Sequence, residues 1–593
     1  MKRIFLATSL AISLNASAAS IQNSVDSLIN KIDPNMNIGV QVVDLSTGEE
    51  LYQRNATRSF IPASNMKLFS DAAALMALGP DYRFKTQLST NAPVLEQGVL
   101  KGSIYIHFPG DPSFTSSDLE GLLAQLRHWG VRRIQGNVVL VSNNSNVNPY
   151  GPGWTPKDFK YSYGAPVAPL ALDENRLLVT VNPSHQVGLP ALIEFPYPGA
   201  IHLNNQVKTS GKAKGCGIDV NMDHDNNLTV RGCIGIGQWA EQAKIAIQNP
   251  LVYAQGVIRQ QLNNLQIGFD GQVVLGSAPS GSLLIATHDS KPIAYLLADT
   301  LKPSDNLYAD SLFLHAAAKI NGAPLNWQQA QPVVKNFLQQ QTGVNLQNAV
   351  LNDGSGLSRQ DQLTPQQTVG LLQFLHERFP LSYEYISALP VAGRDGTLQR
   401  RLRLPSQQGF VRAKTGTMSG IIGLSGYLYT ANGHTLAFAI FANRTSKTKA
   451  EVAWGFRPLV DTLCDFFLKQ HLDGRFYDAA KAHARVAFQL KPAAAEQLRT
   501  KKARWRGLES SVKRALNGQP VSVLFQDDQL VLNDHNADPN KVWAALQSVR
   551  RKQSFAVALQ SKTAPRGNSS PFLLWIKTPV GGALRVWTIR ESA

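Results

Sequence analysis

A serine and a lysine three residues apart are the first residues in the sequence that could carry out covalent chemistry. Ser64 and Lys67 precede a stretch rich in alanine and leucine, residues 68–78, which predicts a helix. Side chains at positions i and i+3 lie on one helix face, so the two groups can meet. A lysine with a lowered pKa can take the proton of a serine nucleophile. The pattern alone is weak, because Ser446 and Lys449 repeat it where we expect solvated surface.

Two further motifs supply hydroxyl, amide and ammonium groups. Ser304 and Asn306 flank Asp305 at the opening of a second helical stretch. The simplest alternative role for this motif is a helix N-cap. Lys414-Thr415-Gly416-Thr417 ends a predicted strand and offers a cation, two hydroxyls and a glycine that a ligand can approach closely.

The three motifs, in this order and on these elements, form the signature of penicillin-binding proteins and β-lactamases. The gap of 240 residues between Ser64 and Ser304 is far longer than most of these proteins need. In this respect the chain resembles the penicillin-binding protein 4 type of D-alanyl-D-alanine carboxypeptidase/endopeptidase, a low-molecular-mass class C penicillin-binding protein. The resemblance spans about residues 20–470 and includes phrases at residues 61–67, 110–113, 163–166, 353–359 and 393–398.

The resemblance implies a role for each motif residue. Ser64 attacks the carbonyl of a D-Ala-D-Ala bond and becomes acylated, and Lys67 takes its proton. A second cation, Lys414, disfavours the charged form of Lys67 and lowers its pKa. Ser304 relays a proton to the leaving amine, and Asn306 holds the substrate amide. The terminal carboxylate of the substrate is bound by Lys414, Thr415, Gly416 and Thr417. The oxyanion hole is formed by the backbone N–H groups of Ser64 and Thr417.

The same family binds the free amino-acid end of the diamino acid in the peptidoglycan stem peptide. The positions that match this pocket are Asp158, Tyr163, Arg359, Met418 and Ser419. An aspartate suits the ammonium group and an arginine suits the carboxylate. Ion pairs within surface loops are the alternative role for Asp158 and Arg359.

The elements around these residues predict an α/β (α+β) serine transpeptidase/β-lactamase-like fold, with an antiparallel sheet flanked by helices. An N-terminal hairpin and a late meander could share this sheet, with a β-rich block inserted between them. Helical patterning resumes near residue 282. The expected elements are a helix at 24–32, strands at 38–44, 49–55, 409–414, 421–430 and 435–442, and a closing helix at 449–469.

The chain begins with the pattern of a secretory signal peptide. A positive start, an apolar stretch at residues 4–14 and a small-residue cleavage site at 16–18 indicate export to the periplasm. An uncleaved anchor is the alternative. We expect a signal peptide (1–18), a penicillin-binding domain in two parts (19–79 and 278–470), an inserted β-rich segment of one or two domains (80–277) and a C-terminal module (471–593).

The C-terminal module carries much of the net charge of +17. Residues 471–593 hold 20 Lys and Arg against 9 Asp and Glu and predict a small α+β module. Such a basic module could bind an anionic wall polymer, a membrane surface or a protein. A solvated structural module is equally compatible with the pattern. Export argues against nucleic acid as the partner.

Three cysteines are present, and exported proteins can form disulfides. Cys216 and Cys233 flank a hairpin-like stretch, residues 218–230, and could be bridged. Cys464 lies in an apolar segment and is expected to be a buried thiol. The cysteine and histidine spacings match no metal site, and no phosphate-binding glycine loop is present, so we expect neither metal nor cofactor.

The sequence therefore predicts an exported serine DD-peptidase that acts on peptidoglycan stem peptides. It would cleave both D-Ala-D-Ala termini and cross-links and would be inhibited by β-lactams. One alternative is a β-lactamase or esterase on the same fold, although no motif supplies the extra carboxylate for rapid deacylation. Another is a catalytically silent cell-wall binding or scaffolding protein that acts through its basic C-terminal module.

Overall fold

The computed structural model describes residues 21–142, 148–212, 215–445, 456–470 and 472, together with five strands between residues 521 and 590. The chain divides into two units, Met1–Tyr477 and Asp478–Ala593. The expected signal peptide (1–18) lies outside the described residues, as do residues 449–455 of the expected closing helix and most of the C-terminal module.

The first unit is built on a five-stranded antiparallel sheet in which the two ends of the unit pair directly. The strand order is β18-β19-β20-β1-β2, and Val40 of β1 faces Ile440 of β20. This pairing confirms that the N-terminal hairpin and the late meander share one sheet. The strands are β1 (Ile38–Asp44), β2 (Glu50–Arg54), β18 (Val411–Met418), β19 (Ile421–Tyr429) and β20 (Thr435–Asn443).

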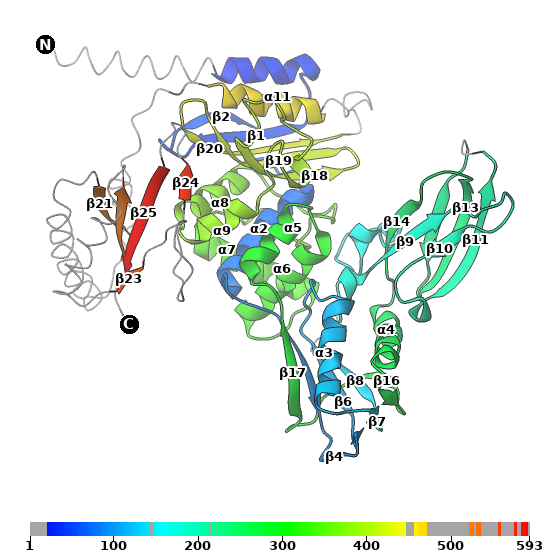
Figure 1. The fold of residues 1–593 in the computed structure, drawn as a ribbon. Coiled ribbons are helices and arrows are strands. Elements are labelled where there is room, and N and C mark those ends of the chain that lie inside the picture. Colours follow the sequence, from blue (N-terminus) through cyan, green and yellow to red (C-terminus); the bar gives the residue numbers. More distant parts are fainter. Residues whose placement is uncertain are drawn as a thin grey trace, which may run out of the picture. The chain divides into compact units, whose positions relative to one another are not determined.

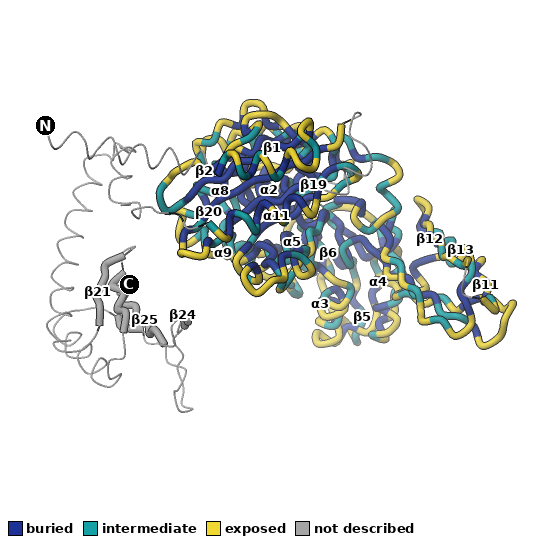
Figure 2. Tube along the Cα trace, turned by 90° about the horizontal axis from the view of Figure 1, so that it is seen from above, coloured by how far each residue is buried: buried dark blue, intermediate teal, exposed yellow. Residues whose placement is uncertain are grey.

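Helices cover both faces of this sheet (Figure 1). Alternating residues of β20 enter different cores, because side chains along a strand point to opposite faces. Phe438 packs with the helix at residues 21–32 and α11 (Phe456–Leu468), whereas Phe441 belongs to the larger helical core. That core contains α2 (Lys67–Leu78), α5 (Ile293–Leu301), α6 (Asn306–Asn321), α7 (Trp327–Thr342), α8 (Pro365–Glu377) and α9 (Leu381–Ala388). In Figure 2 the sheet and α2 form the most continuous buried region.

The chain leaves this body after α2 and returns before α5 through two paired strands. β3 (Lys85–Thr90) and β17 (Leu283–Asp289) are antiparallel neighbours in a sheet of order β16-β8-β6-β3-β17. The helical patterning expected from residue 282 is therefore wrong for residues 283–289, where pairing with β3 outweighs the local pattern. The expected boundary at residue 277 falls ahead of this last strand. The sheet also holds β6 (Ile104–Phe108), β8 (Val138–Ser142) and β16 (Val273–Gly276).

Two helices and a set of very short strands complete this part of the insertion. α3 (Ser116–His128) and α4 (Pro250–Asn264) share one hydrophobic core with the sheet. Thr115 caps α3 by accepting from the backbone N–H of Asp118. The short strands are β4 (Leu95–Glu96), β5 (Val99–Leu100), β7 (Arg133–Ile134) and β15 (Gly268–Phe269).

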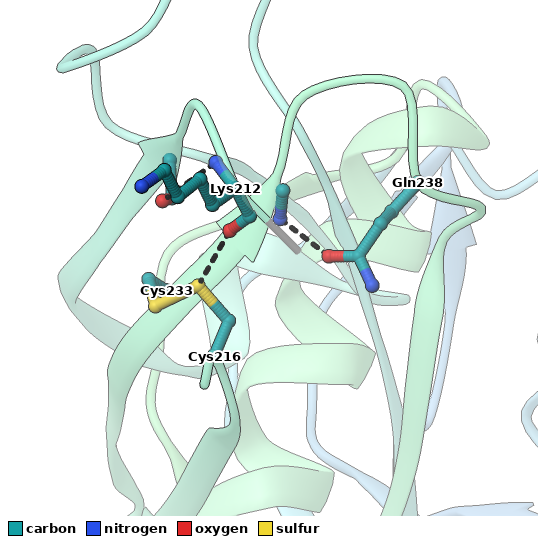
Figure 3. Close-up of a disulfide and its surroundings, with 6 residues drawn as sticks. Lys212, Cys216, Cys233 and Gln238 are labelled. Atoms are coloured by element: carbon teal, nitrogen blue, oxygen red, sulfur yellow. Dashed lines mark hydrogen bonds between the residues drawn. A yellow bond between two sulfur atoms is a disulfide. The ribbon is translucent and has the colours of Figure 1, made fainter. Parts of the chain in front are cut away.

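The distal part of the insertion consists of two three-stranded sheets. One has the order β10-β9-β14 and the other β11-β13-β12. A disulfide joins Cys216, ahead of β12, to Cys233 on β13 (Figure 3). Nearby, the Gln238 side chain accepts a hydrogen bond from the Gly235 N–H, which closes the turn after β13. The strands are β9 (Arg176–Asn182), β10 (Leu192–Glu194), β11 (His202–Ser210), β12 (Ile218–Met222), β13 (Asn227–Gly235) and β14 (Glu241–Ala246).

The described part of the second unit is an antiparallel sheet. Its order is β21-β22-β25-β23, and β24 also pairs with β25. These strands fall within the expected α+β module. They are β21 (Val521–Gln526), β22 (Gln529–Asp534), β23 (Ala556–Ala558), β24 (Trp575–Lys577) and β25 (Ala583–Arg590). No helix within the described residues is long and apolar enough to cross a membrane.

Replacing both bridged cysteines by serine should loosen only the distal sheet. The disulfide spans a sequence separation of 17 residues, and a cross-link of that length contributes on the order of 3 kcal/mol by restricting the unfolded chain. We expect faster amide hydrogen exchange in β11–β13 of Cys216→Ser/Cys233→Ser. Exchange in β1 and β20 is the internal control and should not change. Equal protection of β11–β13 in both proteins would contradict this expectation.

Candidate active site

The candidate nucleophile lies on a tight turn that runs into α2. Ala63–Met66 form a 3-10 turn, and α2 begins at Lys67. Ser64 is half-buried, whereas the Lys67 side chain is completely buried. Lys67 Nζ lies 3.1 Å from Ser64 Oγ. The spacing of the first motif therefore brings hydroxyl and amine within hydrogen-bond distance.

Two other oxygen atoms surround the Lys67 amine. Its Nζ lies 2.6 Å from Asn306 Oδ1 and 2.7 Å from the Ser355 carbonyl oxygen. Both are acceptors only, so a neutral amine must donate its two N–H groups to them. Its lone pair then faces Ser64 Oγ. This arrangement makes Lys67 a proton acceptor for the serine hydroxyl.

Burial is the main cause of the lowered pKa of Lys67. It lowers the pKa of Lys67 to about 8, while Asp310 and Asp353 act in the opposite direction. Lys414 is not among the main causes of the shift at Lys67. Burial, and then repulsion from the Lys67 charge, lower the pKa of Lys414 well below its usual range.

The second motif opens α6 with its middle residue as the cap. Asp305 accepts a hydrogen bond from the Tyr308 N–H at 3.2 Å. Ser304 is therefore not the cap, and it receives a hydrogen bond from Lys414 Nζ at 2.8 Å. Asn306 Nδ2 donates to the Tyr163 carbonyl at 2.8 Å, which turns its Oδ1 toward Lys67. Each end of the motif thus meets one of the two lysines.

The third motif lies on β18, directly against the turn that holds Ser64. A Cβ atom added at Gly416 would lie 2.6 Å from the Pro62 carbonyl oxygen, so only glycine fits this contact. Thr415 Oγ1 donates to Thr397 Oγ1 at 2.7 Å, and Thr417 is exposed. The close approach brings the backbone of Thr417 toward Ser64, as an oxyanion hole requires.

Sequence analysis did not assign a role to the loop that orients Lys67. Asp310 Oδ1 accepts from the backbone N–H groups of Gly354 and Ser355 at 2.8 and 2.9 Å. Asp353 accepts from the N–H of Gly356 at 2.6 Å. These bonds fix the Ser355 carbonyl that contacts Lys67. The phrase at residues 353–359 contains this loop, and its aspartate and glycines were the available signal.

The residues expected to form the side-chain pocket fall into two pairs. Tyr163 Oη donates to Asp158 Oδ1 at 3.2 Å, and Arg359 Nη1 donates to the Ser419 carbonyl at 3.5 Å. Met418, the last residue of β18, is half-buried. Asp158 and Arg359 form no ion pair with any other described residue, so loop ion pairs do not account for them.

A tryptophan joins the segments that carry these pairs. Trp154 Nε1 donates to Asp353 Oδ2 at 2.7 Å. A Cβ atom at Gly153 would lie 2.6 Å from Ser358 Oγ, so residues 153–158 run beside residues 353–359. Cys464 is buried away from this site in the core on the other face of the sheet. Within the described residues, no group of three or more His, Cys, Asp or Glu side chains could hold a metal ion.

Comparison of sequences relates most of the first unit to a known peptidase family. Residues 21–455 match the D-Ala-D-Ala carboxypeptidase 3 (S13) family. The chain is 31% identical over 457 residues to the D-alanyl-D-alanine carboxypeptidase DacB of Haemophilus influenzae, and the match covers 76% of this chain and 95% of that protein. It is also 31% identical over 454 residues to a D-alanyl-D-alanine carboxypeptidase of Actinomadura sp. strain R39, covering 73% and 83% of the two chains.

Comparison with solved structures agrees with the family match. The crystal structure of penicillin binding protein 4 (dacB) from Haemophilus influenzae superposes with a TM-score of 0.67 at 31% identity, over 75% of this chain and 99% of that one. The same protein in complex with a β-lactam gives a TM-score of 0.62 at 30% identity, over 74% and 99% of the chains. The matched share leaves out about a quarter of this chain.

A methyl group at Gly356 should disturb the site far more than the same change at a matched glycine. Gly356 has a φ of +78°, and a Cβ atom there would lie 1.9 Å from the Ala63 carbonyl oxygen; Gly322 has a φ of +80° but no neighbour within 4 Å. We expect Gly322→Ala to lower the free energy of unfolding by about 1 kcal/mol, from backbone strain alone. Gly356→Ala should lower it by about 3 kcal/mol or more, because the collision adds to that strain. Urea unfolding measures both, and equal losses would contradict the proposed contact.

Proposed function

The chain belongs to the D-Ala-D-Ala carboxypeptidase 3 (S13) family, and from this premise we propose that it hydrolyses peptidoglycan stem peptides through an acyl intermediate on Ser64. It is a serine-type D-Ala-D-Ala carboxypeptidase with the serine transpeptidase/β-lactamase-like fold. One observation carries the assignment of residues: Lys67 Nζ lies within hydrogen-bond distance of Asn306 Oδ1, the Ser355 carbonyl and Ser64 Oγ. When the amine is neutral and donates to the first two, its lone pair is directed at Ser64 Oγ.

Acylation begins with transfer of the Ser64 proton to Lys67 Nζ. Ser64 Oγ bonds to the carbonyl carbon of the penultimate D-Ala, and the carbonyl oxygen becomes an oxyanion. The backbone N–H groups of Ser64 and Thr417 stabilise this charge. The close packing of Gly416 against Pro62 supports this role, because it keeps the two N–H groups on adjacent segments.

Release of the terminal D-Ala requires a proton on its nitrogen. The Ser304 hydroxyl, held by Lys414 Nζ at 2.8 Å, delivers this proton as the C–N bond breaks. The Ser304 oxygen then regains a proton from the Lys67 ammonium, which returns to its neutral form. Water then attacks the Ser64 ester, releases the shortened peptide and regenerates the free serine. Asn306 holds the amide of the substrate while its own Oδ1 contacts Lys67.

The substrate carboxylate is assigned to the motif on β18. Lys414 supplies the positive charge and the exposed Thr417 hydroxyl supplies a hydrogen bond, with Gly416 leaving room for the backbone. The Thr415 hydroxyl, which donates to Thr397 Oγ1 in the free protein, would turn to the carboxylate when the substrate binds. A bound carboxylate favours the charged form of Lys414, which offsets the burial that lowers its pKa.

We assign the diamino-acid end of the stem peptide to the two pairs of residues described above. Asp158 would bind the ammonium group and Arg359 the carboxylate, with Tyr163, Met418 and Ser419 around them. Neither Asp158 nor Arg359 forms an ion pair with another described residue, which supports this assignment, although Thr155 and Tyr163 also donate hydrogen bonds to the Asp158 carboxylate. A pocket for a free amino-acid end also suits the cleavage of cross-links, because that end is present on a cross-linked donor side chain. We therefore include endopeptidase activity in the proposal.

The compartment and the C-terminal module complete the proposal. The signal-like residues 1–18 would direct export to the periplasm, where peptidoglycan is accessible. The basic residues 471–593 would bind an anionic surface of the envelope, a wall polymer or a membrane, or a protein. They fall outside the family match, which ends at residue 455, so this function is separate from the proposed catalysis.

Labelling with a fluorescent penicillin tests the nucleophile. A β-lactam places a reactive carbonyl where the substrate carbonyl would lie, so the purified protein should acquire a stable covalent label. Ser64→Ala should acquire none, and the peptide that carries the label should contain Ser64. Ser510→Ala is the control, because Ser510 also lies three residues before a lysine, Lys513, and this variant should be labelled normally. Labelling of Ser64→Ala at the wild-type level would refute the proposal, and rapid turnover of nitrocefin would instead support the β-lactamase alternative.

The pH dependence of acylation tests the base. Lys67 must be neutral to accept the proton, and its pKa is about 8. The acylation rate constant should therefore fall about tenfold per pH unit below pH 8 and level off above it. Lys67→Arg, which stays charged, should remain unlabelled at every pH. A rate that is constant between pH 6 and 9 would exclude Lys67 as the base.

A further inference from the structure

An arginine of the inserted segment reaches the catalytic motif. Arg176 is the first residue of β9, and its side chain is only 6% exposed. Its Nη2 donates to Asp305 Oδ1 at 3.0 Å, and its Nη1 donates to the other oxygen of the same carboxylate. Glu174 also accepts from Nη1, at 2.7 Å. The guanidinium therefore holds Asp305 through a bidentate pair.

The same guanidinium holds a second segment of the site. Arg176 Nε donates to the Ser162 carbonyl at 2.7 Å. The next carbonyl along the chain, that of Tyr163, accepts from Asn306 Nδ2 at 2.8 Å. Arg176 thus fixes both the motif that contains Asn306 and the backbone that orients the Asn306 amide.

Asp305 is the point at which a small movement would affect both lysines. It caps α6 and separates Ser304, which contacts Lys414, from Asn306, which contacts Lys67. Ser304 has a φ of +66°, a left-handed conformation that a serine adopts only when its neighbours hold it. The bidentate pair with Arg176 is the strongest of the contacts that hold this turn.

We propose that Arg176 is a positioning residue for acylation, through which the inserted segment holds Ser304 and Asn306 against the two catalytic lysines. The inference rests on the proposed function, since it assigns a cause to the reactivity of Ser64. It also gives the insertion a role in the reaction itself. An arginine is required because one planar group must reach the Asp305 carboxylate and the Ser162 carbonyl together.

The charge of Arg176 has a second consequence. Asp305 is one of the carboxylates that raise the pKa of Lys67. Without Arg176, the Asp305 carboxylate is less neutralised and stabilises the Lys67 ammonium more strongly. Removal of Arg176 should therefore slow acylation and also move its pH midpoint upward, whereas removal of the Asp305 charge should move the midpoint downward.

The test compares variants in the full-length protein. Arg176→Gln, Arg176→Lys and Asp305→Asn are mixed with fluorescent penicillin, and the acylation rate constant, the dissociation constant of the initial complex, the pH profile and the melting temperature are measured. Arg133→Gln is the matched control, because Arg133 forms a bidentate pair with Asp270 in the insertion but is 56% exposed.

We expect Arg176→Gln to lower the acylation rate constant by about tenfold or more, the loss typical of removing hydrogen bonds to a charged group. The dissociation constant should stay within about twofold, and the pH midpoint should rise above about 8. Arg176→Lys should recover only part of the rate, and Arg133→Gln should match the wild type. If Arg176→Gln does not fold, Asp305→Asn, which keeps an N-cap side chain, must still slow acylation and lower the pH midpoint.

Two outcomes would overturn the inference. One is a folded Arg176→Gln protein that is acylated at the wild-type rate. The other is an Arg176→Gln protein whose acylation is slower only in proportion to its loss of folded protein and whose pH midpoint is unchanged. Failure of the proposed function itself would look different, because the wild-type protein would then carry no label on Ser64.

Discussion

The site depends on the burial of two lysine amines within one protein core. A buried ammonium group is costly, so burial favours the neutral form of both amines. The surroundings then determine what each amine can do. Lys67 meets two fixed acceptors, and only its lone pair is left for Ser64. Lys414 meets Ser304 and the Thr415 carbonyl at the edge of the site, where a substrate carboxylate could restore its charge. The helices, the loop after Asp353 and the turn at Ser304 all serve to hold oxygen atoms around these two nitrogens.

Three separate parts of the chain meet at these amines. The turn at Ala63–Met66 and the start of α2 supply Ser64 and Lys67, the proposed nucleophile and base. The start of α6 and the residues before it supply Asn306 and Ser304, and β18 supplies Lys414. Glycine makes the contacts possible, since Gly416 and Gly356 let backbone pass directly over the turn around Ser64. The insertion adds a fourth part through Arg176. Although its sheets lie outside the catalytic body, the insertion also brings the Tyr163 carbonyl against Asn306, so it borders the site as well as extending from it.

Much of this architecture could be predicted from local sequence. Apolar runs around residues 38–44 and 435–442 are long enough to indicate strands, and the three motifs identify Ser64, Lys67, Ser304, Asn306 and Lys414 as a group. Other features depend on partners distant in sequence. β17 looks helical until β3 is beside it. The hydrogen bonds of Asp310 to the loop at 354–355, and of Arg176 to Asp305, join residues separated by 44 and 129 positions. No periodicity or spacing rule reports such pairs, because each residue taken alone resembles an ordinary charged side chain.

The pairing of β1 with β20 has a consequence for how the enzyme acquires its reactivity. Residues 38–44 can complete their sheet only with residues 436–442, which the ribosome makes almost 400 positions later. The turn at Ser64 likewise needs β18, whose Gly416 packs against the Pro62 carbonyl. Contacts of such high sequence separation carry a large loop-closure cost and form late in folding. A nascent chain therefore holds its serine without an oriented base, and hydrolytic competence arises only when the whole first unit has been synthesised and has folded.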